Sequence, residues 1–293
     1  MAVVAIDVGG TFIRATAADA SGAVITSASQ SAERLRNENP ISVFATLIED
    51  IRANSIERLA GVVIGIPGIL DRQRRSVVNT PNVKALNGLA LADRLEDACR
   101  VPVYLDHDAT LQTRGEALCG SAAGFDLVLG VYFGTGVGAA FLDHGRLVGG
   151  IYRTQIGHVP LRGEGRVGTG GAVDCVEAYA SGLVLEALAN EHGVGIQEAF
   201  ETRSEPSLER GLEMFVRDQG LTIATAVTLL DPEVVVIGGG VTTMRGYPFE
   251  RLVQAVFDRL SPEIGPQRIK IVRANLGSLA AVWGAKSIVE SAT

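Results

Sequence analysis

The chain has 293 residues, 47% of them hydrophobic, which is enough for two domains with sizeable cores. Its formal net charge of −7 argues against nucleic-acid partners and anionic membranes. It does not argue against a nucleotide substrate, because backbone amides and a divalent metal neutralise the negative charge of the phosphates locally. The three cysteines are isolated, no basic leader precedes the first apolar run, and no apolar run reaches ~18 residues. We therefore expect a cytoplasmic protein with no disulfide framework and no membrane contact.

The first predicted strand, residues 3–6, leads directly into the turn Asp7-Val8-Gly9-Gly10-Thr11. Apolar runs and turns alternate up to residue 30, which predicts an antiparallel three-stranded start. Glycine lets a ligand approach the backbone, and the N–H groups of such a turn can hold phosphate oxygens. Taken alone, this turn is more often an ordinary hairpin than a phosphate site.

Helices and buried strands complete the first half. Asn39 is expected to cap a helix that begins at Pro40, because apolar residues recur at helical spacing up to Ile51. Residues 59–66 predict a buried strand that ends in the rigid turn Gly65-Ile66-Pro67-Gly68. We then expect a helix over 89–99, a strand over 101–105 and a helix over 109–119.

Asp108 lies just beyond the strand predicted over 101–105, in Asp106-His107-Asp108. A carboxylate at the carboxyl end of a strand is well placed to accept a proton from an attacking hydroxyl. On position alone, however, such an aspartate is more often a turn residue or the N-cap of the helix that follows. Both interpretations stay open at this point.

The second half repeats the plan of the first. Residues 126–149 predict strands with a turn at 143–145, followed by a glycine-rich, irregular region over 150–173. In each half, strands come first and helices follow, which predicts two α/β domains. The first contains residues 1–108 with about 276–293, and the second contains residues 109–275. The other expected elements are helices at about 174–191 and 206–230, a strand over 234–237 before Gly238-Gly239-Gly240, a further helix, a strand over 269–272 and a helix over 278–290.

A second glycine–threonine turn, Phe133-Gly134-Thr135-Gly136-Val137-Gly138, lies between the strands predicted in residues 126–149. Two such hairpins at equivalent places in two halves favour a nucleotide held between related domains, and hence phosphoryl transfer. The chain has neither a Gly-Lys-Ser/Thr P-loop nor a dinucleotide fingerprint, so such an enzyme would rely on backbone amides, hydroxyls and Mg²⁺. Asp7 is the candidate metal ligand, while Thr11 and Thr135 are candidates for bonds to phosphate oxygens.

Eight short motifs, in this order along essentially the whole chain, resemble those of the ROK family of sugar kinases and repressors. The resemblance implies an α/β, two-domain actin-like (ribonuclease H-like) fold with a central interdomain cleft, in which the ATP γ-phosphate passes to a sugar hydroxyl, C6 by family habit. The motifs are Asp7 to Thr11, Gly65-Ile66-Pro67-Gly68, Thr80-Pro81-Asn82, Asp108-Ala109, Gly134-Thr135-Gly136, Gly157-His158, Glu177 with Ser181-Gly182, and Val236-Ile237-Gly238-Gly239-Gly240.

The resemblance also implies roles for individual residues. Asp108 would be the general base, and Asp7 would bind Mg²⁺ through the nucleotide. The phosphates would lie on Gly9, Gly10, Thr11, Gly134, Thr135 and Gly136, the adenosine near Gly239 and Gly240, and the sugar on Gly68, Asn82, His107, Asp108, Gln155, His158 and Glu177.

One departure from the family concerns zinc. Family members often carry Cys-x-Cys-Gly-x-x-Gly-Cys, whose three cysteines join the histidine of Gly-His around a zinc ion. The aligned run here is Gly168-Thr169-Gly170-Gly171-Ala172-Val173-Asp174-Cys175, so only His158 and Cys175 remain of four ligands. Two ligands are too few for a closed structural site, and we predict no zinc. Without that metal, the glycine-rich loop is expected to stay mobile until sugar binds.

Two further departures concern the sugar. His107 replaces the asparagine that usually precedes the catalytic aspartate, and Gln155 replaces the glutamate of Gly-Glu-x-Gly-His. A carboxylate only accepts hydrogen bonds whereas glutamine also donates, so the site is not expected to be a glucose site. Allose kinases of the family also replace that asparagine, which makes allose or another uncommon hexose the first expectation. N-acetylmannosamine, N-acetylglucosamine and fructose remain open.

Other functions compete with an ATP- and Mg²⁺-dependent kinase. A sugar-responsive repressor of the same family would carry an N-terminal helix-turn-helix, for which the turn at Asp7 leaves no room. A catalytically silent sugar-binding protein is compatible with the lost zinc ligands and with Gln155, but binding sugar alone would not require Asp7, Thr11, Thr135 and Asp108. A homodimer is expected because the family commonly forms one.

Overall fold

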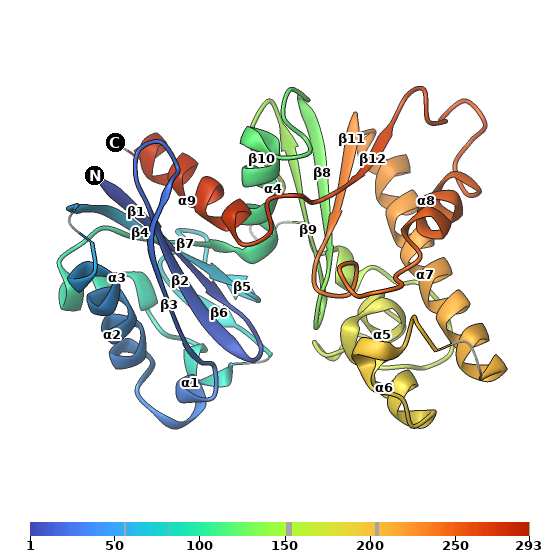
Figure 1. Ribbon diagram of the computed structural model, residues 1–293, viewed down its shortest axis with the longest axis horizontal. Helices are drawn as coiled ribbons and strands as arrows, with labels where there is room; N and C mark the ends of the chain where they lie inside the picture. Colours follow the sequence, from blue (N-terminus) through green and yellow to red (C-terminus); the bar gives the residue numbers. More distant parts are fainter. Residues whose placement is uncertain (56, 82, 151–153, 203–204, 293) are drawn as a thin grey trace. The chain divides into compact units, whose positions relative to one another are not determined.

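The computed structural model describes residues 1–55, 57–81, 83–150, 154–202 and 205–292 (Figure 1). Contacts divide the chain into two compact units. The first contains Met1–Ala123 and the chain from Asn275 onward, and the second contains Gly124–Val148 and most of the chain up to Ala274. Helix α4 (Asp108–Cys119), which follows the boundary expected at residue 108, belongs to the first unit because it packs on the C-terminal helix α9 (Leu279–Ala292).

The first unit is built on a five-stranded sheet with the order β3-β2-β1-β4-β7. The pairs β1–β2 and β2–β3 are antiparallel, which confirms the predicted three-stranded start, and β1–β4 and β4–β7 are parallel. A small second sheet pairs β5 with β6. The strands are β1 (Ala2–Val8), β2 (Phe12–Ala18), β3 (Val24–Ser31), β4 (Leu59–Ile66), β5 (Ile69–Leu70), β6 (Val77–Asn79) and β7 (Val103–His107).

Alternating residues of β1 supply two cores, one on each face of this sheet. Val4 and Ile6 belong to the cluster that contains Phe44 of α2, whereas Val3 belongs to the cluster with Val282 of α9. The α2 helix begins as predicted, since the Asn39 Oδ1 accepts a hydrogen bond of 2.9 Å from the N–H of Ile41. The helices on this face are α1 (Arg34–Asn37), α2 (Pro40–Ala53) and α3 (Leu91–Cys99).

The second unit repeats this sheet topology, with the order β10-β9-β8-β11-β12. An antiparallel hairpin, β8–β9, again opens the unit, and β11 joins β8 in parallel. One large apolar core fills the space between this sheet and its helices. The elements are β8 (Leu127–Phe133), β9 (Val137–Asp143), β10 (Arg146–Val148), α5 (Glu177–Ala180), α6 (Gly182–Glu191), α7 (Pro206–Leu230), β11 (Val234–Gly238), α8 (Phe249–Phe257) and β12 (Lys270–Arg273).

The helix expected at about 174–191 is two helices rather than one. The chain is extended at Ser181, with φ −85° and ψ 162°, between α5 and α6. The break has a long-range cause, because the N–H of Gly182 donates to the carbonyl of Gly134 at 2.7 Å. A Cβ at position 182 would lie 2.5 Å from that carbonyl oxygen, so the approach requires glycine. None of the helices in the described ranges has both the length and the apolar character needed to cross a membrane.

Candidate active site

The turn between β1 and β2 has the predicted tight form. The Gly9 N–H donates to the carbonyl of Phe12 at 3.0 Å, and a Cβ on Gly9 would lie 2.9 Å from that oxygen. Gly10 and Thr11 are exposed, and their N–H groups donate no backbone hydrogen bond in the described part of the chain. This turn can therefore offer at least two N–H groups to an anion.

Asp7 is the penultimate residue of β1 and lies opposite Arg14 of β2. Burial raises the pKa of the Asp7 carboxyl, and the neighbouring Arg14 guanidinium partly offsets that rise. A cation would stabilise the ionised carboxylate further, since metal ligands must be deprotonated. The side chain thus fits a divalent cation carried on a nucleotide.

The turn between β8 and β9 is held at both ends. The Gly134 N–H donates to the carbonyl of Gly136 at 2.9 Å, while the Val137 N–H donates to the Glu177 Oε1 at 2.9 Å. Thr135 is exposed at the tip, and neither its N–H nor that of Gly136 donates a backbone hydrogen bond within the described ranges. Both predicted hairpins therefore present open N–H groups.

The glycine turn after β11 lies against the end of β8. Gly239 has φ +94°, and a Cβ there would lie 2.3 Å from the carbonyl oxygen of Phe133. Gly240 follows, with open space where its side chain would be. The β8–β11 pairing thus brings the residues predicted for adenosine beside the turn predicted for phosphate.

Glu177 lies at the start of α5, packed against glycines of two other segments. A Cβ on Gly136 would lie 2.3 Å from the Glu177 Oε1, and one on Gly157 would lie 2.9 Å from its Cγ. The second carboxylate oxygen, Oε2, accepts a hydrogen bond from the Thr169 hydroxyl. His158 is exposed at the end of the adjoining 3₁₀ turn (Ile156–His158), and Gln155 immediately precedes that turn. The second unit therefore gathers Gln155, His158 and Glu177 around one loop.

In the first unit, Asp108 is the first residue of α4, directly after β7. Its Oδ1 accepts a hydrogen bond of 2.8 Å from the N–H of Ala109. A Cβ on Gly65, at the end of β4, would lie 3.3 Å from the Asp108 Cα, so this glycine lets the helix start approach the sheet. The N-cap position belongs to His107, which makes no capping bond with its side chain.

The turn Gly65-Ile66-Pro67-Gly68 packs against the segment around Thr80. The Thr80 hydroxyl donates to the carbonyl of Pro67 at 2.9 Å, and a Cβ on Gly68 would lie 2.4 Å from the carbonyl oxygen of Asn79. Contacts across this turn thus bring Gly68 and Thr80 together. Asn82 itself lies outside the described residues.

A buried charged cluster adjoins Asp108 and was not predicted from the sequence. Asp106 is fully buried and accepts hydrogen bonds from Arg74 (2.7 Å) and from the N–H of His107 (2.9 Å). Burial raises the pKa of Asp106, while burial and Arg74 lower that of His107 to about 4. The imidazole of His107 is therefore neutral near pH 7. Only the aspartate at a strand end could have signalled this cluster in the sequence.

The two residues that remain of the expected zinc ligands, His158 and Cys175, pack against glycines of the segment 168–170. A Cβ on Gly168 would lie 2.5 Å from the Cys175 Sγ, and one on Gly170 would lie 2.8 Å from the His158 Cε1. Within the described ranges, no three histidine, cysteine or acidic side chains gather in a way that could hold a metal ion.

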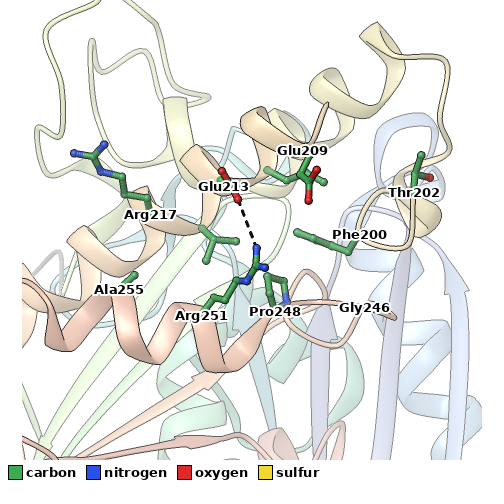
Figure 2. A pocket seen from close by; sticks show the side chains of 11 residues that line it. Phe200, Thr202, Glu209, Glu213, Arg217, Gly246, Pro248, Arg251 and Ala255 are labelled. Atoms are coloured by element: carbon green, nitrogen blue, oxygen red, sulfur yellow. Dashed lines mark ion pairs between the residues drawn. The ribbon is translucent and has the colours of Figure 1, made fainter. Parts of the chain in front are cut away.

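A cavity of about 370 Å³ lies in the second unit, between α7 and α8 (Figure 2). Glu209, Glu213 and Arg251 line it, and the Arg251 Nη1 lies 3.6 Å from the Glu213 Oε1. None of the residues predicted for sugar, phosphate or adenosine lines this cavity.

Comparison with known proteins identifies the group to which this chain is related. The sequence model of the ROK family matches residues 3–292. The chain belongs to the ROK family. A glucokinase of Thermotoga maritima is 25% identical over an alignment of 280 residues that covers 84% of this chain and 88% of that protein. An N-acetyl-D-glucosamine kinase of Photobacterium profundum is 29% identical over 247 residues, covering 76% of this chain and 78% of that protein.

A solved structure gives the fold. The ROK family glucokinase from Streptomyces griseus, in complex with glucose and AMPPNP, matches with a TM-score of 0.84 at 22% identity, covering 99% of this ROK chain and 100% of the other. The family and the two-domain, actin-like sugar-kinase fold expected from the sequence are thereby confirmed. The chain is homologous to sugar kinases, which are phosphotransferases.

Proposed function

We propose that this ROK protein is an ATP-dependent kinase that phosphorylates a hydroxyl of a hexose. The observation that carries the proposal is the pair of hairpin turns with open N–H groups, one in each unit, together with a carboxylate at the end of β7. Phosphoryl transfer depends mainly on positioning and charge stabilisation, which such turns can supply. Relatives that are named glucokinase and N-acetyl-D-glucosamine kinase support the same reaction class.

The nucleotide half of the proposal uses both turns. The N–H groups and hydroxyls of Thr11 and Thr135 bind phosphate oxygens, and Gly239 and Gly240 leave room for the adenosine. Asp7 fits Mg²⁺ carried on the nucleotide, and the metal supplies charge neutralisation for the transferred group. Gly9, Gly10, Gly134 and Gly136 allow the phosphates to approach the backbone.

The sugar half of the proposal assigns proton removal to Asp108. Its carboxylate takes the proton of the attacking hydroxyl, proposed to be that at C6, while the new phosphorus–oxygen bond forms and the bond to ADP breaks. The sugar hydroxyls bind the polar side chains that flank this point. These are Asn82, His107, Gln155, His158 and Glu177, with Gly68 leaving space.

Two of these side chains support a proposal for the hexose. Neutral His107 offers one donor and one acceptor, and Gln155 donates where relatives have a carboxylate. A polar site rejects a wrong epimer sharply because a buried partner is then left unpaired. We therefore propose allose or another uncommon hexose as the substrate, with N-acetylmannosamine, N-acetylglucosamine and fructose as the alternatives.

An ADP-release assay across a panel of hexoses, with and without Mg²⁺, tests this function. We expect ADP release that needs both a hexose and Mg²⁺, with glucose among the poorer substrates. A protein that binds a hexose by calorimetry but releases no ADP with any of them would instead be a silent sugar-binding protein.

A further inference from the structure

We propose that Asp174 is a positioning residue, whose carboxylate closes the loop over residues 160–175 and thereby fixes Glu177 for the sugar. This inference rests on the proposed function, in which Glu177 binds sugar hydroxyls. Side-chain and backbone hydrogen bonds connect this loop to the helices of the second unit.

The backbone at Asp174 is the first observation. Its φ is +56°, a left-handed conformation that favours glycine. The side chain offsets that strain with three hydrogen bonds to one oxygen. Its Oδ1 accepts from the N–H groups of Glu164 and Arg166, each at 3.0 Å, and from the hydroxyl of Tyr179 at 2.5 Å.

These three bonds join the segment 164–166 of the loop to Asp174, and Asp174 to α5. Tyr179 belongs to α5 and is buried, so its hydroxyl is a fixed donor. Backbone bonds reinforce the closure: the N–H of Asp174 donates to the carbonyl of Arg166 at 2.6 Å, and the N–H of Leu161 donates to the carbonyl of Asp174 at 2.8 Å. The Tyr179 hydrogen bond also lowers the pKa of Asp174, which favours the ionised acceptor.

A second connection attaches the loop to α7. The Arg162 guanidinium donates to both carboxylate oxygens of Asp218, each at 2.6 Å through Nη2, and lies 5.1 Å from the ring centroid of Tyr179. Arg166 lies at the same distance from that ring. Bidentate arginine–carboxylate pairs of this kind restrict geometry strongly, particularly here, where the Asp218 side chain is nearly buried.

The closed loop reaches the candidate sugar site through Thr169. The Thr169 hydroxyl donates to the Glu177 Oε2, while the Oε1 of the same carboxylate accepts from the N–H of Val137 beside the phosphate turn. One oxygen of Glu177 is thus held by the loop and the other by the β8–β9 turn. Opening the loop removes the hydrogen bond to Oε2 and leaves the hydrogen bond to Oε1 in place.

Two substitutions at position 174 distinguish the effect of the carboxylate from the effect of the backbone conformation. Asp174→Gly removes the acceptor and relieves the left-handed strain, whereas Asp174→Asn keeps an Oδ1 acceptor and tolerates the same φ. The matched control is Asp231→Gly, because Asp231 is also left-handed, with φ +45°, and its carboxylate pairs with Arg268 away from the loop.

Trypsin cleavage after Arg162 and Arg166, mapped by mass spectrometry, reports loop closure without any turnover. We expect Asp174→Gly to be cut about tenfold faster than the native protein, and Asp174→Asn and Asp231→Gly to be cut at nearly the native rate. Native cleavage rates in Asp174→Gly would overturn the proposal. Cleavage that is equally fast in Asp231→Gly would overturn it too, because the effect would then not come from the loop.

Two readouts test the effect on Glu177. We expect Asp174→Gly to raise the KM for the hexose about tenfold while the KM for ATP changes less than twofold, and an unchanged hexose KM would overturn the positioning role. Hydrogen exchange at the Val137 amide needs no substrate, and we expect it to rise severalfold in Asp174→Gly. If neither the native protein nor any variant phosphorylates a hexose, the proposed function fails. Faster exchange of the Val137 amide in Asp174→Gly would then still support the contacts that run from Asp174 to Glu177, and unchanged exchange would overturn them.

Discussion

Replacing His107 by asparagine should change how the stability of the protein depends on pH. The side chain is 7% exposed, its Nε2 has no hydrogen-bond partner among the described residues, and its pKa is lowered to about 4 by burial and Arg74. In the unfolded chain the pKa returns to about 6.5. Between these two values the unfolded state binds a proton that the folded state refuses, so stability is lost as the pH falls from about 6.5 to about 4.

The size of this loss of stability follows from the difference between the folded and unfolded pKa values of His107. Each pKa unit corresponds to about 1.4 kcal/mol, so the contribution of His107 falls by about 2 kcal/mol between pH 7 and pH 4.5. Asp7 and Asp106 act in the opposite direction, because their raised pKa values make the folded state take up protons first as the pH falls. Only the difference between the native protein and His107→Asn isolates the imidazole.

Urea unfolding at pH 7 and pH 4.5, followed by the fluorescence of the single tryptophan, measures that difference. We expect the native protein to lose about 2 kcal/mol more than His107→Asn over this interval. Equal losses in the two proteins would refute the reasoning, because His107 would then titrate alike in the folded and unfolded states.

Two further substitutions test the packing of α4. Glu116 is fully buried, and its two carboxylate oxygens accept four hydrogen bonds, two from the N–H groups of residues 275 and 276 and two from Ser121. Glu116→Gln should therefore lower the free energy of unfolding, measured in urea, by about 2 kcal/mol. A cost below about 0.5 kcal/mol would show that these bonds are replaceable. Gly284→Ala should cost about 2 kcal/mol because its Cβ would lie 2.1 Å from a carbonyl oxygen of α4, whereas Gly163→Ala, in open space, should be nearly neutral. Similar unfolding midpoints for these two alanine variants would contradict the close helix contact.

Local features of the fold were predictable because neighbouring residues determine them. The glycine turns at Gly9 and Gly134 lie between apolar runs, and Asn39 precedes Pro40 at a helix start, as the structure confirms. The repeat of hairpin and parallel strands in both halves follows from the same local patterns.

Features that depend on distant partners were not predictable. The break at Ser181 arises from a contact between Gly182 and Gly134, which no helix periodicity can reveal. The pair Arg162–Asp218 likewise joins residues 56 positions apart, and Asp174 owes its role to a backbone conformation that a single sequence does not display. In the candidate site, motif residues could therefore be named, but the side chains that hold them could not.

Single-turnover transfer from ATP to the best hexose of the panel, compared between the native protein and Asp108→Asn, tests the central claim most directly. Asparagine keeps the size of the side chain but cannot take a proton, so we expect the rate to fall by about 10² to 10⁴. The dissociation constant for the hexose, measured by calorimetry, should change less than about threefold, since the amide still forms hydrogen bonds. A rate within tenfold of the native value would contradict the assignment of Asp108 as the base.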